Sequence, residues 1–145
     1  MAATGDRSDP YAAFNFLVTI NEITVAAFSE VSGIETDSDV IEYRNGNEGI
    51  AKRKLPGLNK FTNITLKRGI TNNRGLWAWR KQVMDGTVKR QSGRIDLLNE
   101  TREVVLTYKF RDGWPSKWQG PALHAGNSEV AIETLEIACE AIELE

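Results

Sequence analysis

The side chains that most often carry catalysis or bind metals are scarce in this chain. It has one histidine, His124, and one cysteine, Cys139, among 145 residues. A Cys-His or Ser-His-Asp nucleophile needs a histidine held by partner groups, and a zinc site needs several thiolates or imidazoles. Neither residue has such partners near it in the sequence, and Cys139 has no second thiol with which to form a disulfide. We interpret Cys139 as a small buried apolar residue.

Carboxylates are the one reactive group that recurs in regular order. Glu129, Glu133, Glu136, Glu140 and Glu143 follow one another at alternating spacings of four and three residues, which would place them on one face of a helix. Carboxylates in such a row repel one another, so the pattern indicates a solvated or partner-facing surface rather than the acid-base pair of a glycosidase. P-loop, dinucleotide, G-x-S-x-G and H-E-x-x-H motifs are all missing. The sequence predicts a protein that is not an enzyme and uses no cofactor or metal.

The charges are divided along the chain. Residues 44–111 hold 16 Lys/Arg and 5 Asp/Glu, whereas the rest of the chain holds 2 Lys/Arg and 15 Asp/Glu. The basic middle could bind nucleic acid. Alternatively, the acidic ends of one copy could meet the basic middle of the next and favour self-association. A third interpretation is an ordinary solvated surface on which the charges mix once the chain has folded.

Length and hydropathy predict a single domain over residues 1–145, which is long enough to bury a core. No apolar run approaches the roughly 18 residues of a membrane span. The first ten residues, MAATGDRSDP, lack the apolar stretch of a secretory signal. We therefore expect synthesis in the cytoplasm without membrane insertion, and we interpret residues 1–10 as a flexible or partner-docked arm.

Alternating apolar and polar residues predict that most of the chain is β-strand. In the clearest strand, Glu103–Arg111, the side chains of Tyr108 and Phe110 face the core while those of Lys109 and Arg111 face water. Further strands are expected over 14–20, 23–31, 40–44, 61–68 and 87–98. A helix is expected over Arg74–Met84, capped by Thr71 or Asn72 and ended by Asp85-Gly86. The prediction is a mainly β fold, an antiparallel β-sandwich or rolled barrel of about seven or eight strands with one α-helix and a long protruding loop.

Two tryptophan pairs need a place to pack. Trp77 and Trp79 cannot both lie at the centre of the helix's apolar stripe, so one should fill the core and the other touch a loop or a partner. Trp114 and Trp118 stand among Gly113, Pro115, Gly120 and Pro121, a density of Gly and Pro that predicts a loop. Such a loop must bury its aromatic rings on its own domain or on a neighbour.

The longest predicted loop is Asn45–Leu58, with Gly46, Gly49, Pro56 and Gly57 around the basic run Lys52-Arg53-Lys54. A loop of about 14 residues is long for a compact domain and is usually functional or disordered. Two interpretations stay open: a mobile surface loop, and an arm that becomes ordered against a neighbouring subunit.

The order of several segments resembles one family. GWPSKWQGP over 113–121 and EVAIETLEI over 129–137 resemble the C-terminal signature of tail-tube proteins from contractile phage tails and related contractile injection systems. FNFLV at 14–18, FSEVSG at 28–33, IEYR at 41–44, RKLPG at 53–57, ITLKRG at 64–69 and LWAW at 76–79 continue the resemblance over about residues 9–145. It favours a closing strand over residues 130–145, where the glutamate spacing favours a helix. The sequence departs from the family pattern at Cys139 and Ala141, where a His and a Gly would be expected.

The resemblance implies a structural subunit of an inner tube, built from stacked six-membered rings as a hollow conduit for phage DNA or an injected effector. It implies homo-hexameric partners, a sheath outside, and initiator, baseplate and terminator proteins at the tube ends, within a phage tail or injection particle assembled in the bacterial cytoplasm. It also implies a helix near Trp77 on the outer side. Residues expected in the inter-subunit arm are Arg44, Asn45, Glu48, Lys52, Arg53, Lys54, Leu55 and Pro56. Residues expected to face the lumen are Glu42, Arg44, Asn63, Thr65, Lys67, Lys109 and Arg111.

Two rival functions remain at this point. One is a nucleic-acid-binding β-domain that uses the basic middle; however, the aromatic residues of its strands fall mostly on the core face, where they cannot stack on bases. The other is a tube-like effector carrier of a type VI system with a similar fold.

Overall fold

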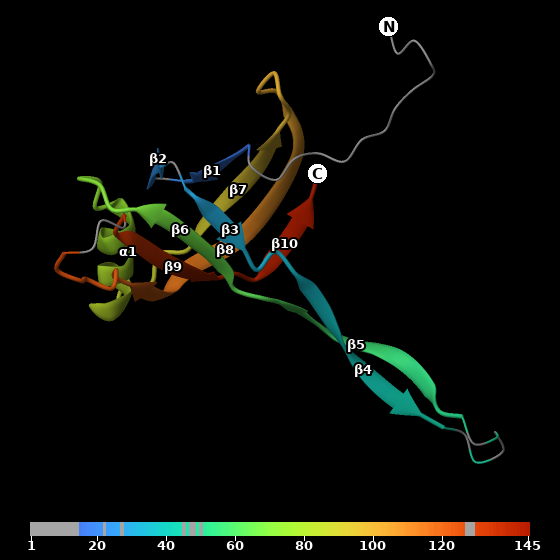
Figure 1. Cartoon of the computed structure of the whole chain (residues 1–145). Coiled ribbons are helices and arrows are strands. Elements are labelled where there is room, and N and C mark those ends of the chain that lie inside the picture. The colour runs from blue at the N-terminus through green and yellow to red at the C-terminus, as the bar shows by residue number, and fades with distance from the viewer. Residues whose placement is uncertain are drawn as a thin grey trace, which may run out of the picture.

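A computed structural model describes residues 15–21, 23–26, 28–44, 46, 49, 51–126 and 130–145, with the backbone alone for 23–26. The expected mainly β fold with one helix is confirmed, although these residues form ten strands rather than seven or eight (Figure 1). The elements are β1 (Phe16–Ile20), β2 (Ile23–Ala26), β3 (Glu30–Ser32), β4 (Thr36–Tyr43), β5 (Arg53–Phe61), β6 (Ile64–Gly69), α1 (Gly75–Met84), β7 (Gln91–Leu98), β8 (Val104–Gln119), β9 (Ile132–Ala138) and β10 (Ala141–Leu144).

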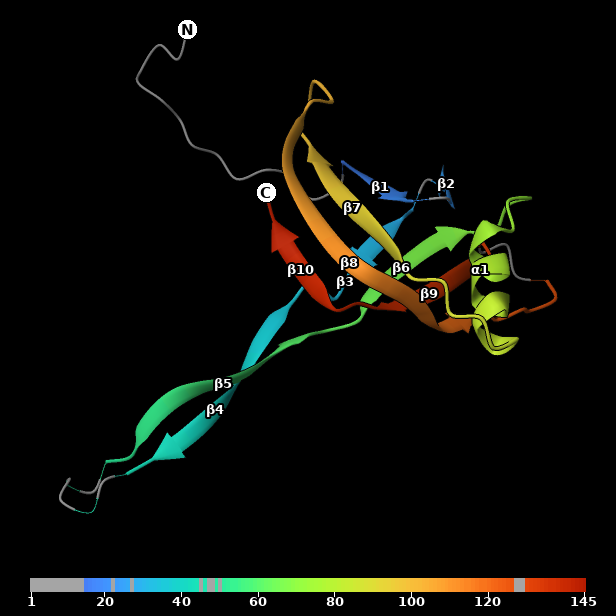
Figure 2. The same ribbon diagram turned by 180° about the vertical axis from the view of Figure 1, so that it is seen from behind.

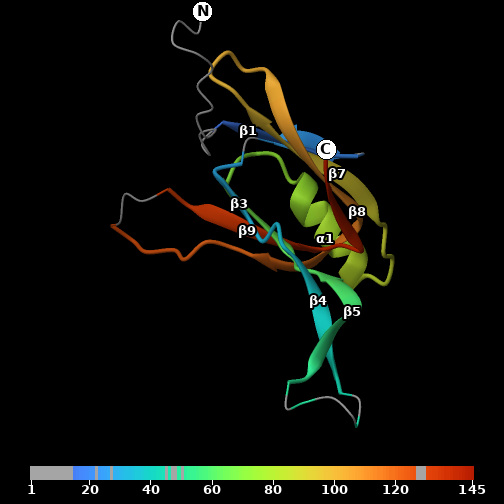
Figure 3. The same cartoon turned by 90° about the vertical axis from the view of Figure 1, so that its right-hand side faces the viewer.

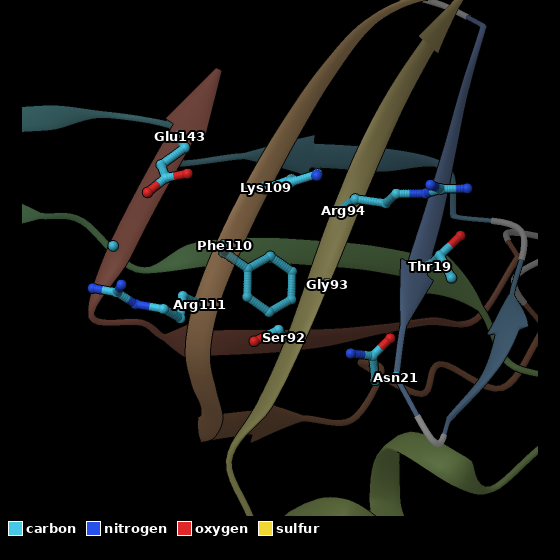
Figure 4. Close-up of a pocket in the computed structure, with 10 residues that line it drawn as sticks. Thr19, Asn21, Ser92, Gly93, Arg94, Lys109, Phe110, Arg111 and Glu143 are labelled. Carbon is cyan, nitrogen blue, oxygen red and sulfur yellow. The ribbon is translucent and has the colours of Figure 1, made fainter. Parts of the chain in front are cut away.

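All strands except β4 and β5 belong to one antiparallel sheet that folds over into two layers. The β7 layer contains β2, β1, β7, the first part of β8, and β10. The β6 layer contains the last part of β8, then β9, β6 and β3. Strand β8 serves both layers because its residues up to Gly113 pair with β7 and those from Trp114 onward pair with β9. The strands of the β6 layer cross behind those of the β7 layer (Figure 4).

The change of layer in β8 has a local cause. Asp112 has a φ of 53°, and the β7–β8 register shifts between Gln91 and Gly93, as in a β-bulge that bends a strand. The ring of Phe110 fills the space beside Gly93, where an added Cβ would lie 2.5 Å from the ring's Cζ. An added Cβ on Gly113 would likewise meet the Phe110 ring at 2.8 Å. The two glycines therefore let a large aromatic ring pack at the bend.

The core lies between the two layers and is closed at one end by α1. Leu66 and Leu135 are fully buried, as is Ile137, at the centre of the β6 layer. The helix buries Leu76 and Trp79, and the indole Nε1 of Trp79 donates to the carbonyl of Lys89 at 2.9 Å. The buried cluster comprises Val18, Ile20, Ile64, Leu66, Leu76, Trp79, Ile95, Phe110, Leu135, Ile137 and Ile142.

The helix matches its expected range closely, but not its expected cap. It begins after Arg74, where neither Thr71 nor Asn72 is the N-cap, and the Asn73 side chain instead accepts a hydrogen bond from the Gly75 amide. It ends at Asp85 and Gly86, as predicted. On its buried face, Trp79 is the tryptophan that enters the core, while Trp77 is exposed.

Strands β4 and β5 form a separate two-stranded sheet that extends away from the two layers (Figures 1 and 2). We call residues 36–61 the arm, and the two layers with α1 the body. The side view shows the arm leaving the body below β3 (Figure 3). The predicted loop Asn45–Leu58 is wrong from Arg53 onward, since β5 begins there and pairs with β4 from Tyr43 to Thr36. Pro56 is compatible with this strand because β5 pairs along one edge only among the residues that the structure describes.

Two further sequence expectations were wrong, and a third segment follows the family resemblance. Residues 23–31 form two strands, β2 and β3, rather than one. Strand β2 pairs with β1 in the β7 layer and β3 pairs with β6 in the β6 layer, so the chain changes layer near Phe28, which packs against the core. The predicted Trp114–Trp118 loop is strand, with Pro115 buried at a register shift and Gly120 beyond the strand end. The glutamate pattern does not form a helix: residues 132–138 and 141–144 are β9 and β10, as the family resemblance favoured.

Candidate assembly surfaces

The arm presents an apolar face to solvent. Ile41 and Leu55 are register partners, and Tyr43 lies two residues along on the same side. These side chains are 51%, 46% and 41% exposed. Within the described part of the chain, β4 and β5 pair only with each other, and an isolated two-stranded hairpin is marginally stable in water. The arm therefore lacks the burial that stabilises the body.

The charged residues of the arm pair along its length. Lys52 lies 3.2 Å from Glu42 near the tip, and Lys60 lies 2.7 Å from Asp39 near the base. The hydrogen bond to Asp39 and its charge raise the pKa of Lys60. Of the residues expected in the arm, Arg44 and Lys52 flank the strands and Arg53, Lys54, Leu55 and Pro56 lie in β5. Asn45 and Glu48, like residues 1–10, lie outside the described residues.

The outer face of the β6 layer carries three of the residues expected in a lumen: Asn63, Thr65 and Lys67. The Lys67 ammonium lies 3.1 Å from Glu30 on β3, and the Asn63 amide donates to Glu136 on β9 at 3.4 Å. The strand register places mostly small or polar residues on this face, with half-buried Trp114 at its margin beside Ala138. The set comprises Glu30, Ser32, Asn63, Thr65, Lys67, Lys117, Gln119, Thr134, Glu136 and Ala138.

Lys109 and Arg111 lie instead on the outer face of the β7 layer, which points the opposite way (Figure 4). They line a cleft of about 370 Å³ together with Arg94 and Glu143. Lys109 pairs with Glu145 at 2.6 Å, and Arg94 with the buried Asp96 at 3.2 Å. The expected lumen set is thus divided between two faces, with Glu42 and Arg44 on neither of them because both belong to the arm and its tip.

The tryptophans divide between core and surface. Trp79 fills the core, while Trp77 is 39% exposed and meets Trp118 edge-on, with ring centroids 4.9 Å apart. One helix tryptophan fills the core, as expected, whereas the other touches strand β8 rather than a loop or a partner. Another cleft of the body is mostly apolar and lies beside Trp77 and Trp118. Arg74 also lines it. Trp114 is half-buried.

A buried ion pair lies within the β6 layer, close to the segment that leads into the helix, and sequence reasoning missed it. Arg68 and Glu133 are register partners on β6 and β9, and the Arg68 Nε donates to the Glu133 carboxylate. Arg68 also donates to the carbonyl of Asn73 at 2.9 Å, and the Trp118 indole donates to Glu133 at 3.3 Å. The available signal was that Arg68 continues the core-facing alternation of Ile64 and Leu66, a position where a charge requires a partner.

The described residues contain no group of three or more His, Cys, Asp or Glu side chains that could hold a metal ion. Among the same residues, α1 is too short and too polar to cross a membrane. Cys139 is half-buried, which raises the pKa of its thiol.

A two-layered antiparallel sheet with a mostly polar outer face and a projecting hairpin is an architecture typical of structural subunits. Residues 12–143 match the model of the T4-like virus tail tube protein gp19 family, and the chain belongs to this family. It is a tail-tube structural subunit of the kind found in contractile injection systems.

Similar chains occur in several solved structures, among them the following three. One, in the anti-feeding prophage (AFP) tube-terminating cap, is 25% identical, has a TM-score of 0.87 and aligns over 100% of this chain and 99% of its own length. One in the six-fold symmetrised AFP baseplate is 28% identical, with a TM-score of 0.86 and coverage of 96% and 97%. One in the extended sheath–tube complex of PVC, an extracellular contractile injection system, is 25% identical, with a TM-score of 0.85 and coverage of 94% and 91%.

A type six secretion system protein is 12% identical, with a TM-score of 0.62 over 91% of this chain and 83% of its own. That likeness shows a shared fold alone. No curated protein matches the sequence.

Proposed function

We propose that this tail-tube subunit forms six-membered rings that stack into a hollow conduit for DNA or a protein effector. The family match and the similar chain in a six-fold symmetrised baseplate support this proposal. Similar chains in a sheath–tube complex and a tube-terminating cap support a sheath, a baseplate or initiator, and a terminator as partners. The role is structural, involves no catalytic step, and is carried out by one tail-tube domain of a phage tail or injection particle assembled in the bacterial cytoplasm.

The β6 layer is the best candidate for the wall of the conduit, and the direction of its edge strands carries this proposal. Its strand order is β8, β9, β6 and β3, all antiparallel, so the two edge strands run in opposite directions. Copies joined edge to edge would continue the antiparallel alternation around a ring, which removes the free edges. In the β7 layer, the edge strands β2 and β10 run the same way, so the same joining would require a parallel pair.

The side chains agree with this choice. The outer face of the β6 layer is mostly polar, as the wall of a water-filled channel should be, so that cargo does not adhere to it. Asn63, Thr65 and Lys67 would then line the lumen. Lys109 and Arg111 would face away from it, with the helix also on the outer side towards the sheath.

The arm supplies the contact between copies in this proposal. It continues directly from β3 and β6, the strands of the proposed wall, and carries its apolar face beyond the body. A contact of this kind between different surfaces on two copies is heterologous, so it can close a ring or continue as an open stack.

Electron microscopy of the purified protein at moderate salt tests assembly. The matched variant replaces residues 41–55 with an Asn-Gly turn, which joins Val40 to its register partner Pro56 and leaves the body unchanged. We expect rings or tubes from the original chain and loss of stacking in the variant, whose thermal unfolding should stay within a few degrees. As a control, Leu123→Ser, at a side chain that is 82% exposed on the body, should still form tubes. A chain that stays monomeric at every concentration, even with a baseplate initiator added, would contradict the proposal.

Thiol labelling tests which face lines the lumen. In a Cys139→Ala background, Thr65→Cys is placed on the β6 layer and Arg94→Cys on the β7 layer. Each is reacted with a maleimide polymer wider than the channel, before and after assembly. We expect assembly to slow labelling of the first variant about tenfold or more and to leave the second nearly unchanged. The opposite pattern would assign the lumen to the β7 layer.

A further inference from the structure

The arm is connected to the body by two short segments that lie side by side where it leaves β3 and β6 (Figure 3). These segments, residues 33–35 and 62–64, are called the joint. On the body side of the joint Ser32 pairs with Thr65, and on the arm side Thr36 pairs with Phe61. Both strands therefore have three residues between these pairs, with no residue inserted in either. The joint interrupts the pairing of the two strands without shifting their register.

The interruption lies at Gly33. Its φ of 85° is a left-handed conformation that residues with a side chain rarely adopt. A Cβ added to Gly33 would lie 2.1 Å from the carbonyl oxygen of Asn63 on the other strand. The joint therefore requires glycine for two separate reasons, its backbone conformation and the close approach of the two strands.

Hydrogen bonds hold the joint in this conformation. The Gly33 carbonyl accepts from the Glu35 amide at 2.9 Å, which closes a three-residue turn around Ile34. The same carbonyl accepts from the Thr62 hydroxyl of the other strand at 2.6 Å. The Thr62 amide donates back to the Glu35 carbonyl at 3.4 Å. Of these three bonds, the one from the Thr62 hydroxyl comes from a side chain and crosses between the strands.

Apolar contacts fix the joint to the body. Ile34 packs against the core cluster, and so does Phe61, the residue just before the joint on the second strand. The thiol of Cys139, which follows β9 and also packs against the core, lies 3.9 Å from the Thr62 carbonyl oxygen and donates to it. Beyond the joint, the described side chains of β4 and β5 are mostly exposed. The joint is therefore where the direction of the arm can be set.

We propose that the joint holds the arm of the free subunit in one direction, with Thr62 as the positioning residue. The alternative is a free hinge, because glycine also changes conformation easily. A rotation at Gly33 would move its carbonyl away from both of its donors, and the second strand would have to bend with it. The anchors at Ile34 and Phe61 oppose that movement on both strands. This inference concerns the unassembled subunit and goes beyond the proposed function.

Distances between paired spin labels, measured by electron paramagnetic resonance, test the proposal below the concentration of assembly. All chains carry Cys139→Ser, which removes the thiol and keeps a hydroxyl donor beside the Thr62 carbonyl. The labels are attached at Lys54→Cys on the arm and Gln119→Cys on the body, both exposed positions. We expect a narrow distance distribution for the original joint, one at least twice as wide for Thr62→Val, and a narrow one again for Thr62→Ser. A broad distribution from the original joint, or an unchanged one from Thr62→Val, would overturn the proposal.

A label pair within the body is the control. Gln82→Cys on the exposed side of α1 is combined with Gln119→Cys. This distribution should be the same in all three chains, and thermal unfolding should stay within a few degrees. Broadening of both label pairs in Thr62→Val would mean that the whole fold has loosened, which would count against a specific role for Thr62.

Two glycine variants separate the close approach of the strands from backbone strain. Gly33→Ala and Gly86→Ala both place a side chain at positive φ, 85° and 96°, but a Cβ on Gly86 meets nothing within 4 Å. We expect Gly33→Ala to shift the mean arm-to-body distance, because the strands have to separate, and Gly86→Ala to leave it unchanged. An unshifted distance in folded Gly33→Ala would contradict the proposal. If Gly33→Ala does not fold, the Thr62 variants decide.

Assembly gives a further measurement, which rests on the proposed function. An arm that already points in one direction loses less conformational freedom on association than one that swings. Thr62→Val should therefore raise the concentration needed for tubes about threefold or more, and Thr62→Ser should leave it unchanged. Tubes from Thr62→Val at the original concentration would reject this consequence. Absence of tubes from the unsubstituted chain would reject the tube function, whereas the label distances would still decide whether the joint holds the arm.

Discussion

The body and the arm of this protein are stabilised in different ways. In the body, Leu66 and Leu135 are fully removed from water, and α1 closes one end of the core. In the arm, Val40 is 61% and Leu58 76% exposed, and among the described residues the two strands pair only with each other. The difference teaches that the body has a buried core of its own, whereas the described residues of the arm keep their large apolar side chains largely exposed. The predictions below test that division, from the largest expected effect on unfolding to the smallest.

The largest effect should come from the buried ion pair. Arg68→Met leaves the Glu133 carboxylate buried without its cation, which should lower the free energy of unfolding by about 3–5 kcal/mol. Urea denaturation measures the loss. The double variant Arg68→Met/Glu133→Leu removes both charges and should recover most of it. A loss below about 1 kcal/mol in the single variant would show that water reaches Glu133.

A pair of leucine substitutions compares the two regions directly. Leu66→Ala creates a cavity in the core and should cost about 2–5 kcal/mol. Leu58→Ala, at a side chain that is mostly exposed on the arm, should stay within about 0.5 kcal/mol. Chemical denaturation of both monomers provides the comparison. Equal losses would mean that the arm is packed in the monomer, contrary to the division proposed here.

The two helix tryptophans should differ less strongly. Trp79→Phe removes the indole hydrogen bond to the Lys89 carbonyl from a buried site and should cost about 1 kcal/mol. Trp77→Phe, at an exposed site that keeps an aromatic ring beside Trp118, should cost about half as much or less. Thermal unfolding followed by circular dichroism can rank the two. The reverse ranking would contradict the assignment of Trp79 to the core.

On the arm, a double substitution should separate folding from assembly. Ile41→Ser/Leu55→Ser removes the apolar face while leaving monomer stability within about 0.5 kcal/mol, since both side chains are exposed in the monomer. Tubes should be lost under the electron microscope. Normal tubes from this variant would mean that the apolar face of the arm makes no contact between copies.

The smallest effect concerns Cys139. Burial raises the pKa of its thiol, so its alkylation rate should increase at a higher pH than that of Thr65→Cys in monomers of the Cys139→Ala background. The folded state holds the thiol proton more tightly than the unfolded state. The thiol therefore contributes a small stability that falls as the pH rises above the unfolded value. Iodoacetamide labelling across a pH series measures this, and coincident pH profiles would contradict it.

Several elements could be predicted from local pattern because one principle dominated them. The alternation around Tyr108 and Phe110, and the helix with its stop at Asp85-Gly86, follow from burial on one face and from helix-end chemistry. Prediction failed where tertiary partners changed the meaning of a residue. The spacing of Glu133 placed it on an apparent acidic helix face. In the structure it lies on β9 as the register partner of Arg68 on the neighbouring strand β6. Pro115 and its neighbouring glycines indicated a loop, yet a bulge and a free strand edge accommodate them within β8.

The sequence by itself determined the class of this protein: a mainly β chain with one helix, scarce catalytic side chains, and a basic, glycine-containing segment that projects from the core. These properties depend on composition and on short-range periodicity. Only the tertiary structure decided which faces share a surface. The bend at Asp112 turns β8 from one layer to the other and interrupts its alternation, since Phe110 faces the core before the bend and Pro115, five residues later, faces it after the bend. That is why Lys67 and Lys109, both on wet strand faces, lie on opposite sides of the protein.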